Sequence, residues 1–466
     1  MQLTFLGANR QVTGSRYCLE AGGRKLMIDC GIFQEREFLS RNWDSCPLPA
    51  REIDALLLTH AHLDHSGLIP RLVNEGFHGP IYATRPTVAL AEVVLRDAAH
   101  IQAEDAAYKR KRHAREGRAG KHPEVPLYTE ADVDRAVPLF RPVPYRKPVS
   151  INQAFSVRFH DAGHMLGSAM LEVTATEGDV TRSVIFSGDV GQWDKPLIRD
   201  PSVFEQADYV VMETTSGDRD HRDAGDIETQ LSDVINATAS RGGVVLMPTF
   251  AMERAQELMY HLSRLVYSQR IPQIPIFLDS PMAVRVTDIF LKSRDFFDEE
   301  TWQLIAAHQP PLQFPGLRLV SSVEESKSIN AVRTPAVIMA SSGMCNAGRI
   351  KHHLAVRIGH HQNTILFVGY QGRGTLGRQI LEGQPEVRIH GRPQRVRAQI
   401  AQIHGLSGHA DRDTLLRWLG TIQKPPRRVF LTHGEEHAAL AMAEYIEQQR
   451  HWTAYVPKYQ ETVELA

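Results

Sequence analysis

The sequence predicts an α/β protein in which a second domain interrupts the first. The chain has 466 residues, more than a single hydrophobic core usually serves. Short apolar strands separated by turns fill residues 1–215, and the same style returns in residues 394–466. Between them, in residues 216–393, apolar strands alternate with helices. Such alternation is typical of a mostly parallel sheet with helices on both faces.

The predicted elements follow from short apolar runs bounded by turn residues. In the first part, strands are expected at residues 1–7, 25–29, 53–59, 80–83, 155–159 and 183–187, and a helix at residues 87–121. In the middle part, strands are expected at residues 243–248, 274–278, 335–340 and 364–368, the first three of them followed by helices. An amphipathic helix near residues 435–450 is expected to close the chain.

Composition excludes several classes of protein. The longest apolar runs have the length of strands, so we expect no membrane contact. The N-terminus lacks the basic and apolar regions of a signal peptide, and the four cysteines form no CxxC pair. We therefore expect a cytoplasmic protein with reduced thiols. The net charge of −1 means that nucleic acid could be bound only by local basic patches.

Four metal-type side chains crowd into one short turn after the apolar run 53–59: His60, His62, Asp64 and His65. Burying three imidazoles and a carboxylate together is costly unless a cation organises them. Nitrogen and oxygen donors suit zinc or a similar divalent ion. A lone histidine would more often be a satisfied core residue, but four such residues together favour a metal site.

Further polar residues stand at or near predicted strand ends, where a rigid sheet can hold a ligand in place. They are Asp29, His164, Asp189, Glu213, His409 and His433. Taken alone, Asp29 is more readily a turn residue, and His164 and Asp189 are ordinary loop residues. A site for two metal ions, however, needs an anionic oxygen donor that bridges them, and Asp189 suits that role.

These residues carry a family resemblance that covers essentially the whole chain. The HxHxDH segment with Asp29, His164 and Asp189 resembles the metallo-β-lactamase superfamily. The segments around Glu213, His409 and His433 resemble its β-CASP branch, which includes the endonuclease subunit of pre-mRNA 3′-end processing and bacterial and archaeal ribonucleases. The resemblance implies an αββα metallo-β-lactamase sandwich, residues 1–215 and 394–466, with an inserted β-CASP α/β domain, residues 216–393.

The resemblance also implies a role for each residue around two zinc ions. His60, His62 and His164 would bind one ion, and Asp64, His65 and His433 would bind the other. Asp189 and a hydroxide would bridge the ions, and Asp29 would fix the tautomer of a ligand histidine without binding a metal itself. His409 would be the general acid, oriented by Glu213. The residues expected to take part in catalysis are thus Asp64, Asp189, Glu213 and His409.

The expected activity is hydrolysis of RNA phosphodiester bonds, by analogy leaving a 5′-phosphate and a 3′-hydroxyl. RNA-acting members of the branch carry histidine at the position of His433, whereas DNA-repair members typically carry valine. We therefore expect single-stranded RNA as substrate, cut internally, from the 5′ end, or both. One departure is the Thr-Thr-Ser-Gly segment after Glu213, where the branch often has Ser-Thr-Tyr-Gly.

Alternative functions are a DNA nuclease, a small-ester hydrolase and a non-catalytic RNA-binding scaffold. His433 argues against DNA, and the long inserted domain argues against a small ester. The intact set of metal and acid–base residues argues against a scaffold. A homodimer is left open.

Candidate substrate contacts rest on weaker patterns. One basic stretch holds Lys109, Arg110, Lys111, Arg112, Arg115, Arg118 and Lys121, and is equally well a solvated helix face or a phosphate-steering patch. A second, residues 387–410, includes Arg395 and Arg397 and leads into His409. Backbone N–H groups of Ser341, Ser342 and Gly343, before the helix around Arg349, could bind a phosphate or simply form a turn. Arg373 is expected in a loop near the active site.

Overall fold

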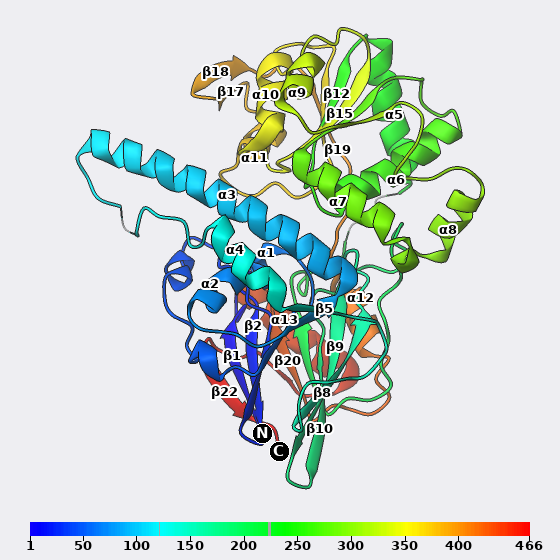
Figure 1. Ribbon diagram of the computed structural model, residues 1–466. Coiled ribbons are helices and arrows are strands. Elements are labelled where there is room, and N and C mark those ends of the chain that lie inside the picture. Colours follow the sequence, from blue (N-terminus) through cyan, green and yellow to red (C-terminus); the bar gives the residue numbers. More distant parts are fainter. Residues whose placement is uncertain (121, 222–224) are drawn as a thin grey trace. The chain divides into compact units, whose positions relative to one another are not determined.

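The chain passes between two structural units in a computed structural model that describes residues 1–120, 122–221 and 225–466 (Figure 1). The first unit comprises residues 1–195, 200–220 and 409–466, and the second comprises residues 196–199 and 221–408. The interruption of one unit by another therefore has the order expected from the sequence. The predicted limits of the inserted domain, 216 and 393, stay predictions; the long segment of the second unit runs from 221 to 408 and so ends 15 residues beyond the predicted limit.

The first unit contains two seven-stranded sheets. One has the order β22-β1-β2-β3-β4-β5-β6. Its strands are β1 (Gln2–Gly7), β2 (Arg16–Ala21), β3 (Arg24–Ile28), β4 (Ala55–Leu57), β5 (Ile81–Thr84), β6 (Phe140–Val143) and β22 (Glu461–Glu464). The other has the order β21-β20-β11-β10-β9-β8-β7. Its strands are β7 (Val149–Ser150), β8 (Phe155–Asp161), β9 (Ala169–Glu177), β10 (Val180–Phe186), β11 (Tyr209–Glu213), β20 (Arg428–Thr432) and β21 (Ala454–Tyr455).

The core of the first unit lies between these two sheets. Leu19 and Ile28 of one sheet belong to the same buried cluster as Phe159 and Leu171 of the other. The ring of Phe5 lies 5.1 Å from that of Phe430, which joins the sheets face to face. Burial of alternate strand residues on the two inner faces is the driving force of such a sandwich.

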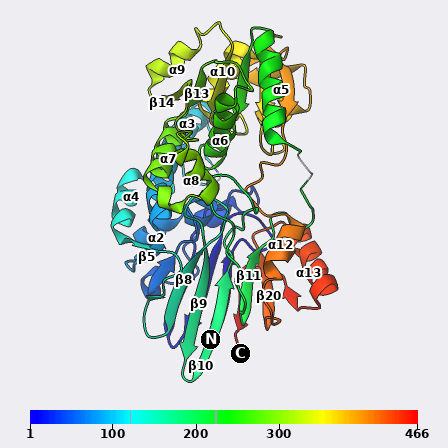
Figure 2. The same cartoon turned by 90° about the vertical axis from the view of Figure 1, so that its right-hand side faces the viewer.

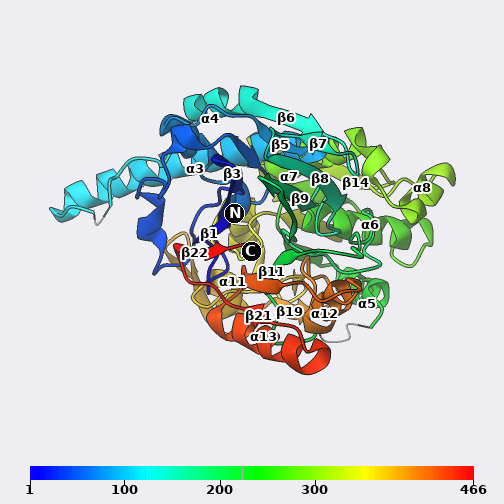
Figure 3. The same cartoon turned by 90° about the horizontal axis from the view of Figure 1, so that it is seen from below.

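Helices cover the outer faces of the two sheets. The helices of this unit are α1 (Leu63–Ser66), α2 (Ile69–Asn74), α3 (Arg85–Glu116), α4 (Glu130–Ala136), α12 (Arg412–Leu419) and α13 (Glu436–Arg450). Figure 3 shows α3 and α4 on one side of the sheets and α12 and α13 on the other. Trp418 and Met442 pack with Met212 of β11, so the second helical layer has its own buried cluster. The αββα sandwich expected from the sequence is confirmed.

The second unit is built on a six-stranded sheet in which every neighbouring pair is parallel. Its order is β14-β13-β15-β12-β16-β19, with β12 (Val244–Pro248), β13 (Ile276–Asp279), β14 (Leu317–Val320), β15 (Ala336–Ala340), β16 (Thr364–Phe367) and β19 (Gln399–Gln402). Its helices are α5 (Ile227–Ser240), α6 (Arg254–Tyr267), α7 (Pro281–Lys292), α8 (Glu299–Ala306), α9 (Val323–Ile329), α10 (Gly348–Arg357) and α11 (Leu376–Leu381) (Figure 2). A hairpin, β17 (Glu386–Ile389) and β18 (Arg392–Arg395), follows α11. The expected mostly parallel α/β domain is confirmed.

The observed elements differ from the expected ones mainly at their ends. The strand expected at residues 53–59 is shorter in the structure, where β4 comprises only Ala55–Leu57. At its end, the N–H of Thr59 donates to the carboxylate of Asp29 (2.9 Å) instead of to a neighbouring strand. The helix expected at residues 87–121 is α3, which ends at Glu116, and residue 121 lies outside the described residues. Among the described residues, no helix is long and apolar enough to cross a membrane.

Candidate metal and acid–base centre

The HxHxDH segment folds as the turn between β4 and α1. His62 is the N-cap residue of α1, and Asp64 and His65 lie inside that helix. The carbonyl of Asp64 accepts from the N–H of Ser15 (2.8 Å). A Cβ atom on Gly31 would lie 1.6 Å from that same carbonyl, so only glycine lets the loop after β3 pass there. The histidines are thus held by backbone contacts as well as by the sheet.

Asp29 follows β3 of the first sheet, and most of the other predicted residues of the centre lie at or after strand ends of the second sheet. His164 lies between β8 and β9, Asp189 follows β10, Glu213 ends β11, and His433 follows β20. The loops of His164 and Asp189 touch, because a Cβ atom on Gly191 would lie 1.6 Å from the carbonyl oxygen of Gly163. His409 differs from the expectation, because it lies in the loop between β19 and α12, seven residues after the end of β19.

One group of four ligand atoms consists of His60 Nε2, His62 Nδ1, His164 Nε2 and Asp189 Oδ2. His62 Nδ1 lies 3.0 Å from His60 Nε2 and 3.2 Å from His164 Nε2. Asp189 Oδ2 lies 3.4 Å from His60 Nε2 and 3.5 Å from His164 Nε2. A tetrahedral zinc ion with bonds of about 2.0–2.1 Å keeps its ligand atoms about 3.3 Å apart. The donor set therefore fits such an ion.

A second group combines Asp64, His65 and His433 with the other oxygen of Asp189. His65 Nε2 lies 3.0 Å from His433 Nε2 and 3.2 Å from Asp189 Oδ1. Asp64 Oδ2 lies 3.5 Å from His433 Nε2. Asp189 Oδ1 is buried and accepts no hydrogen bond from the described part of the chain. A buried carboxylate oxygen in this position requires a cation or donor, so the two oxygens of Asp189 suit two neighbouring ions.

Hydrogen bonds behind the imidazoles set which ring nitrogen faces the centre. Asp29 is buried and accepts from His65 Nδ1 (2.6 Å) and from the hydroxyl of Thr59 (3.0 Å). Thr59 in turn accepts from His60 Nδ1 (3.1 Å). Because Nδ1 carries the proton in both rings, the Nε2 lone pairs of His60 and His65 point into the centre.

The pKa values of the histidines separate the two groups. Burial, with the neighbouring His60, lowers the pKa of His62 to about 3, and burial also lowers the pKa values of His60 and His164. These rings are neutral at pH 7 and can donate lone pairs. Burial also disfavours the cationic forms of His65 and His433, but Asp189 with Asp29 or Asp64 outweighs it and raises their pKa values. A bound cation would take the place of those protons.

His409 and Glu213 form a pair beside the ligand groups. His409 Nδ1 lies 3.1 Å from Glu213 Oε1 and 3.9 Å from Asp189 Oδ2. The His409 side chain is 26 % exposed, whereas that of Glu213 is fully buried. Burial lowers the pKa of His409, but Glu213 and Asp189 outweigh it and raise the pKa to about 9. The arrangement is that of a protonated imidazole, reachable from solvent and oriented by a buried carboxylate.

Sequence reasoning missed three hydroxyl groups that support the ligands. They belong to Ser15, Thr59 and Thr215: Ser15 donates to Asp29, and Thr215 Oγ1 lies 3.2 Å from His433 Nδ1. For Thr59 the sequence did contain a signal, because His60 and His433 each follow a Leu-Thr pair at the end of a predicted strand. Thr215 carries no such signal, because it meets His433 across 218 residues of sequence.

Seven of the predicted substrate contacts lie in the second unit, whereas the basic stretch from Lys109 onward lies in the first. Arg349 donates to buried Asp279 (2.6 Å) and to the carbonyl of Ser321 (2.6 Å), so much of its guanidinium is engaged within the unit. Ser341 and Ser342 donate to Ser280 and to the carbonyl of Ala347, and the carbonyl of Gly343 accepts from Gln371. Arg373, Arg395 and Arg397 are exposed. RNA contact by these seven residues stays a prediction.

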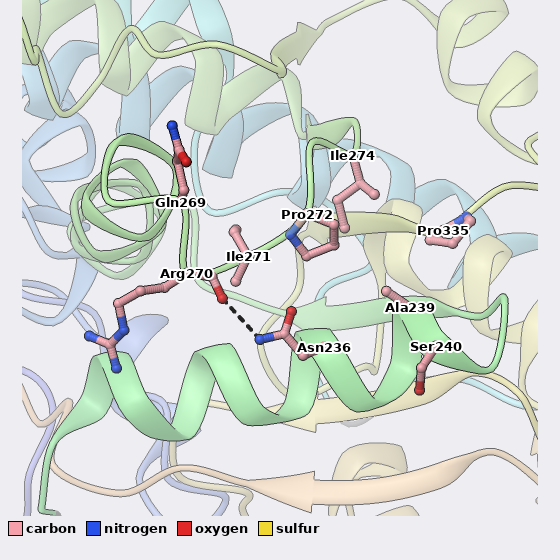
Figure 4. A pocket seen from close by; sticks show the side chains of 9 residues that line it. All are labelled: Asn236, Ala239, Ser240, Gln269, Arg270, Ile271, Pro272, Ile274 and Pro335. Atoms are coloured by element: carbon pink, nitrogen blue, oxygen red, sulfur yellow. Dashed lines mark hydrogen bonds between the residues drawn. The ribbon is translucent and has the colours of Figure 1, made fainter.

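A hollow of about 470 Å³ in the second unit lies between α5 and the loop before β13 (Figure 4). Asn236 donates to the carbonyl of Arg270 across it (2.9 Å), and Arg270 is the one charged residue of its lining. Its lining has neither the histidines nor the carboxylates of the centre in the first unit, so we assign the chemistry to that centre.

Comparison with known proteins gives matches along most of the chain. Residues 18–189 match the metallo-beta-lactamase superfamily domain, residues 255–380 the Beta-Casp domain, and residues 393–457 the Zn-dependent metallo-hydrolase RNA specificity domain. Among curated proteins, ribonuclease TTHA0252 of Thermus thermophilus is 41% identical over 446 residues, covering 96% of each chain. The transcription termination factor FttA of Methanocaldococcus jannaschii is 31% identical over 470 residues, which cover 98% of this chain and 70% of that protein.

A solved structure shares the fold at low sequence identity. It is a protein of unknown function from Enterococcus faecalis V583, with a TM-score of 0.56 and 12% identity, covering 100% of this chain and 99% of the other. At that identity the likeness supports the fold alone.

Proposed function

Because this chain belongs to the β-CASP family of metal-dependent hydrolases with a metallo-β-lactamase fold, we propose that it is a zinc-dependent ribonuclease. The observation that carries the proposal is the position of Asp189, whose two carboxylate oxygens face different sets of imidazoles. That geometry suits two metal ions sharing one carboxylate, which is the arrangement of many phosphodiester-cleaving centres.

Two groups of side chains would hold the ions. His60, His62 and His164 with Asp189 would hold one, and Asp64, His65 and His433 with Asp189 would hold the other. When bound, two zinc ions supply positive charge next to the scissile phosphate and lower the pKa of water, so that hydroxide is available near neutral pH. Neutral imidazole and carboxylate donors favour zinc over magnesium or calcium, which prefer all-oxygen sites.

His409 would give a proton to the departing sugar oxygen. Its Nδ1 faces Glu213, so the proton to be transferred would be on Nε2. Glu213 is itself fixed, because its Oε1 accepts from the N–H of Val190 (2.8 Å). The leaving oxygen would become the 3′-hydroxyl of one product, and the phosphate would stay on the 5′ end of the other.

Single-stranded RNA is the proposed substrate. The RNA specificity description of residues 393–457, the ribonuclease name of the Thermus relative and the histidine at position 433 all favour RNA over DNA. A non-catalytic scaffold is disfavoured because the metal and acid–base residues are all present. A homodimer, and the cytoplasm as the compartment, stay predictions; the four unpaired cysteines agree with a reducing compartment.

The proposal is tested by incubating the protein with end-labelled single-stranded RNA and with DNA of the same sequence. RNA with a 5′-phosphate, a 5′-hydroxyl and a 5′-triphosphate separates internal cleavage from cleavage that starts at the 5′ end. We expect RNA products that carry 5′-phosphates, formed only with zinc present. Equal cleavage of DNA would favour the DNA nuclease, and RNA binding without cleavage would favour the scaffold.

A further inference from the structure

The second half of α3 is exposed and strongly basic. Figures 1 and 3 show its C-terminal end running beyond the other helices of the first unit. From residue 109 to residue 118 the chain has six cationic side chains and a single acid, Glu116. Packing against the rest of the unit does not explain such an excess of positive charge on an exposed helix. The segment is either a surface that only faces solvent or a surface that binds a partner.

One side of this helix segment carries three of these six cations together with an aromatic ring. At 3.6 residues per turn, the side chains of Tyr108, Lys111, Arg112 and Arg115 share one stripe about 100° wide. We call these four residues the basic face of α3. Tyr108 is 65% exposed, and the three cations are exposed as well. An exposed aromatic ring among cations is the combination that single-stranded nucleic acid binds, by base stacking and phosphate contact.

The opposite side of the segment is attached to the protein. Ala106 and His113 are buried there, His113 is hydrogen-bonded to Glu124, and Arg110 donates to the Glu124 carbonyl (3.1 Å). The helix is therefore fixed along one side by the returning chain. Its basic face points the other way, away from the body of the unit.

Carboxylates neutralise little of the basic face. Arg112 lies 3.6 Å from Glu116, and the same acid is shared with Arg118. Lys111 and Arg115 have no ion pair within the described parts of the chain. The helix dipole slightly stabilises cations in the last turns of a helix. That effect does not explain why three cations of α3 lie on the same side of the helix as an exposed aromatic ring.

The first turn of α3 lies beside the metal and acid–base centre. The hydroxyls of Thr84 and Thr87 donate to the carbonyl of Gly167, in the loop that carries His164 (2.6 and 2.8 Å). With a rise of about 1.5 Å per residue, the 24 residues from Thr87 to Lys111 span about 36 Å. A ligand of the basic face that also reaches the centre must therefore be a long polyanion.

We infer that the basic face of α3 binds single-stranded RNA several nucleotides away from the bond that is cut. This inference rests on the proposed RNA substrate. The cations would contact phosphates, and Tyr108 would stack on a base without reading sequence. The face would raise affinity for long RNA and leave the chemistry at the centre unchanged. The seventh cation of the predicted stretch, Lys121, lies outside the described residues.

The test compares two double variants of the full-length protein with the same change of charge. Lys111→Gln with Arg115→Gln removes two cations from the basic face. The control, Lys147→Gln with Lys424→Gln, removes two exposed lysines of the first unit that lie elsewhere in the sequence. KM and kcat are measured on a six-nucleotide and a thirty-nucleotide RNA, and binding of the longer RNA is measured in a His409→Ala background at several salt concentrations.

For the basic-face variant we expect KM on the long RNA to rise about tenfold at low salt, with kcat and the short RNA unaffected. The slope of log affinity against log salt should become shallower by about 1.4, since each lost phosphate contact contributes about 0.7 on a single strand. Tyr108→Ala should weaken binding of the long RNA about fivefold or more without changing that slope.

Two results separate this inference from the proposed function. If the basic-face variant matches the control on the long RNA in both KM and salt slope, the inference is wrong while the nuclease function stands. If the wild-type protein binds long RNA through this face but cleaves no RNA with zinc present, the proposed function fails and the binding face stands. Absence of any RNA binding would overturn both.

Discussion

The Nδ1 atom of His409 lies 3.1 Å from Oε1 of Glu213, and the two residues meet across 196 positions of sequence. The carboxylate is fully buried and is held by backbone N–H groups of Val190 and Thr215. The imidazole is partly exposed and stands at the edge of the proposed metal ligands. A fixed carboxylate behind a reachable imidazole orients the ring and keeps it protonated, which is what a general acid requires.

Replacing His409 with alanine should remove the proton donor but leave the metal ligands. We expect His409→Ala to keep its zinc content and to lose between about 10²- and 10⁴-fold in kcat. The measurement is kcat on single-stranded RNA beside zinc content by elemental analysis. His78→Ala, at an exposed histidine of the same unit, is the control and should leave kcat unchanged. Full activity in His409→Ala would exclude this residue as the acid.

The pH dependence of kcat should depend on Glu213. Glu213 is the largest of the carboxylate influences that raise the pKa of His409 to about 9 against the effect of burial. A raised pKa means that the protonated form is present below about pH 9 and is lost as the pH rises through that value. In Glu213→Gln the pKa falls, so the alkaline decline of kcat should move to lower pH. An alkaline decline at the same pH in both proteins would contradict the pairing.

Asp189 should be needed for both ions, because each of its oxygens faces a different donor group. We expect Asp189→Asn to bind less than one zinc per chain and to lose activity on RNA. The midpoint of thermal unfolding should then no longer rise when zinc is added, since the stabilisation comes from metal binding. Asp179→Asn, at an exposed carboxylate, should bind zinc as the wild type does. Two tightly bound ions in Asp189→Asn would rule out the shared carboxylate.

Asp29 should tune metal affinity without touching a metal. It accepts from His65 Nδ1 and Thr59, so its loss would free the ring of His65 to change tautomer. We expect Asp29→Asn to weaken zinc binding by about 10–100-fold, and its activity should return at high zinc concentration. Ser15→Ala removes a single hydrogen bond to Asp29 and should have a smaller effect. A kcat that stays low at saturating zinc would show that Asp29 acts on more than the ligand.

How much of the centre could be predicted depends on whether its signal is local. His60, His62, Asp64 and His65 stand within six positions, so their spacing alone suggested a metal site. Asp189, Glu213 and His433 stand at or near strand ends, and the family resemblance supplied their proposed roles. The contacts of Thr215 and Arg349 have no such signal. Thr215 meets His433 across 218 positions, and Arg349 donates to Asp279 across 70. Hydrogen-bond partners this far apart are set by the packing of whole elements, which periodicity does not contain.

The fold shows the same contrast: the positions of strands have a local sequence signal, whereas their exact ends depend on contacts between distant residues. Apolar runs predicted where β4 and β12 lie, but the early end of β4 is decided by the buried carboxylate of Asp29, which captures the N–H of Thr59. The predicted limit at residue 393 precedes β19, which pairs with β16 in the sheet of the second unit. Gln399-Ile400-Ala401-Gln402 is short and half polar, so its sequence gives little sign of that pairing.

The central claim is tested most directly by stripping the protein of metal with a chelator and titrating zinc back while the rate of single-stranded RNA cleavage is measured. We predict no cleavage in the stripped protein and full recovery when two zinc ions are bound per chain, with products that carry 5′-phosphates. Cleavage at the full rate by the stripped protein, or failure of zinc to restore any cleavage, would contradict the account.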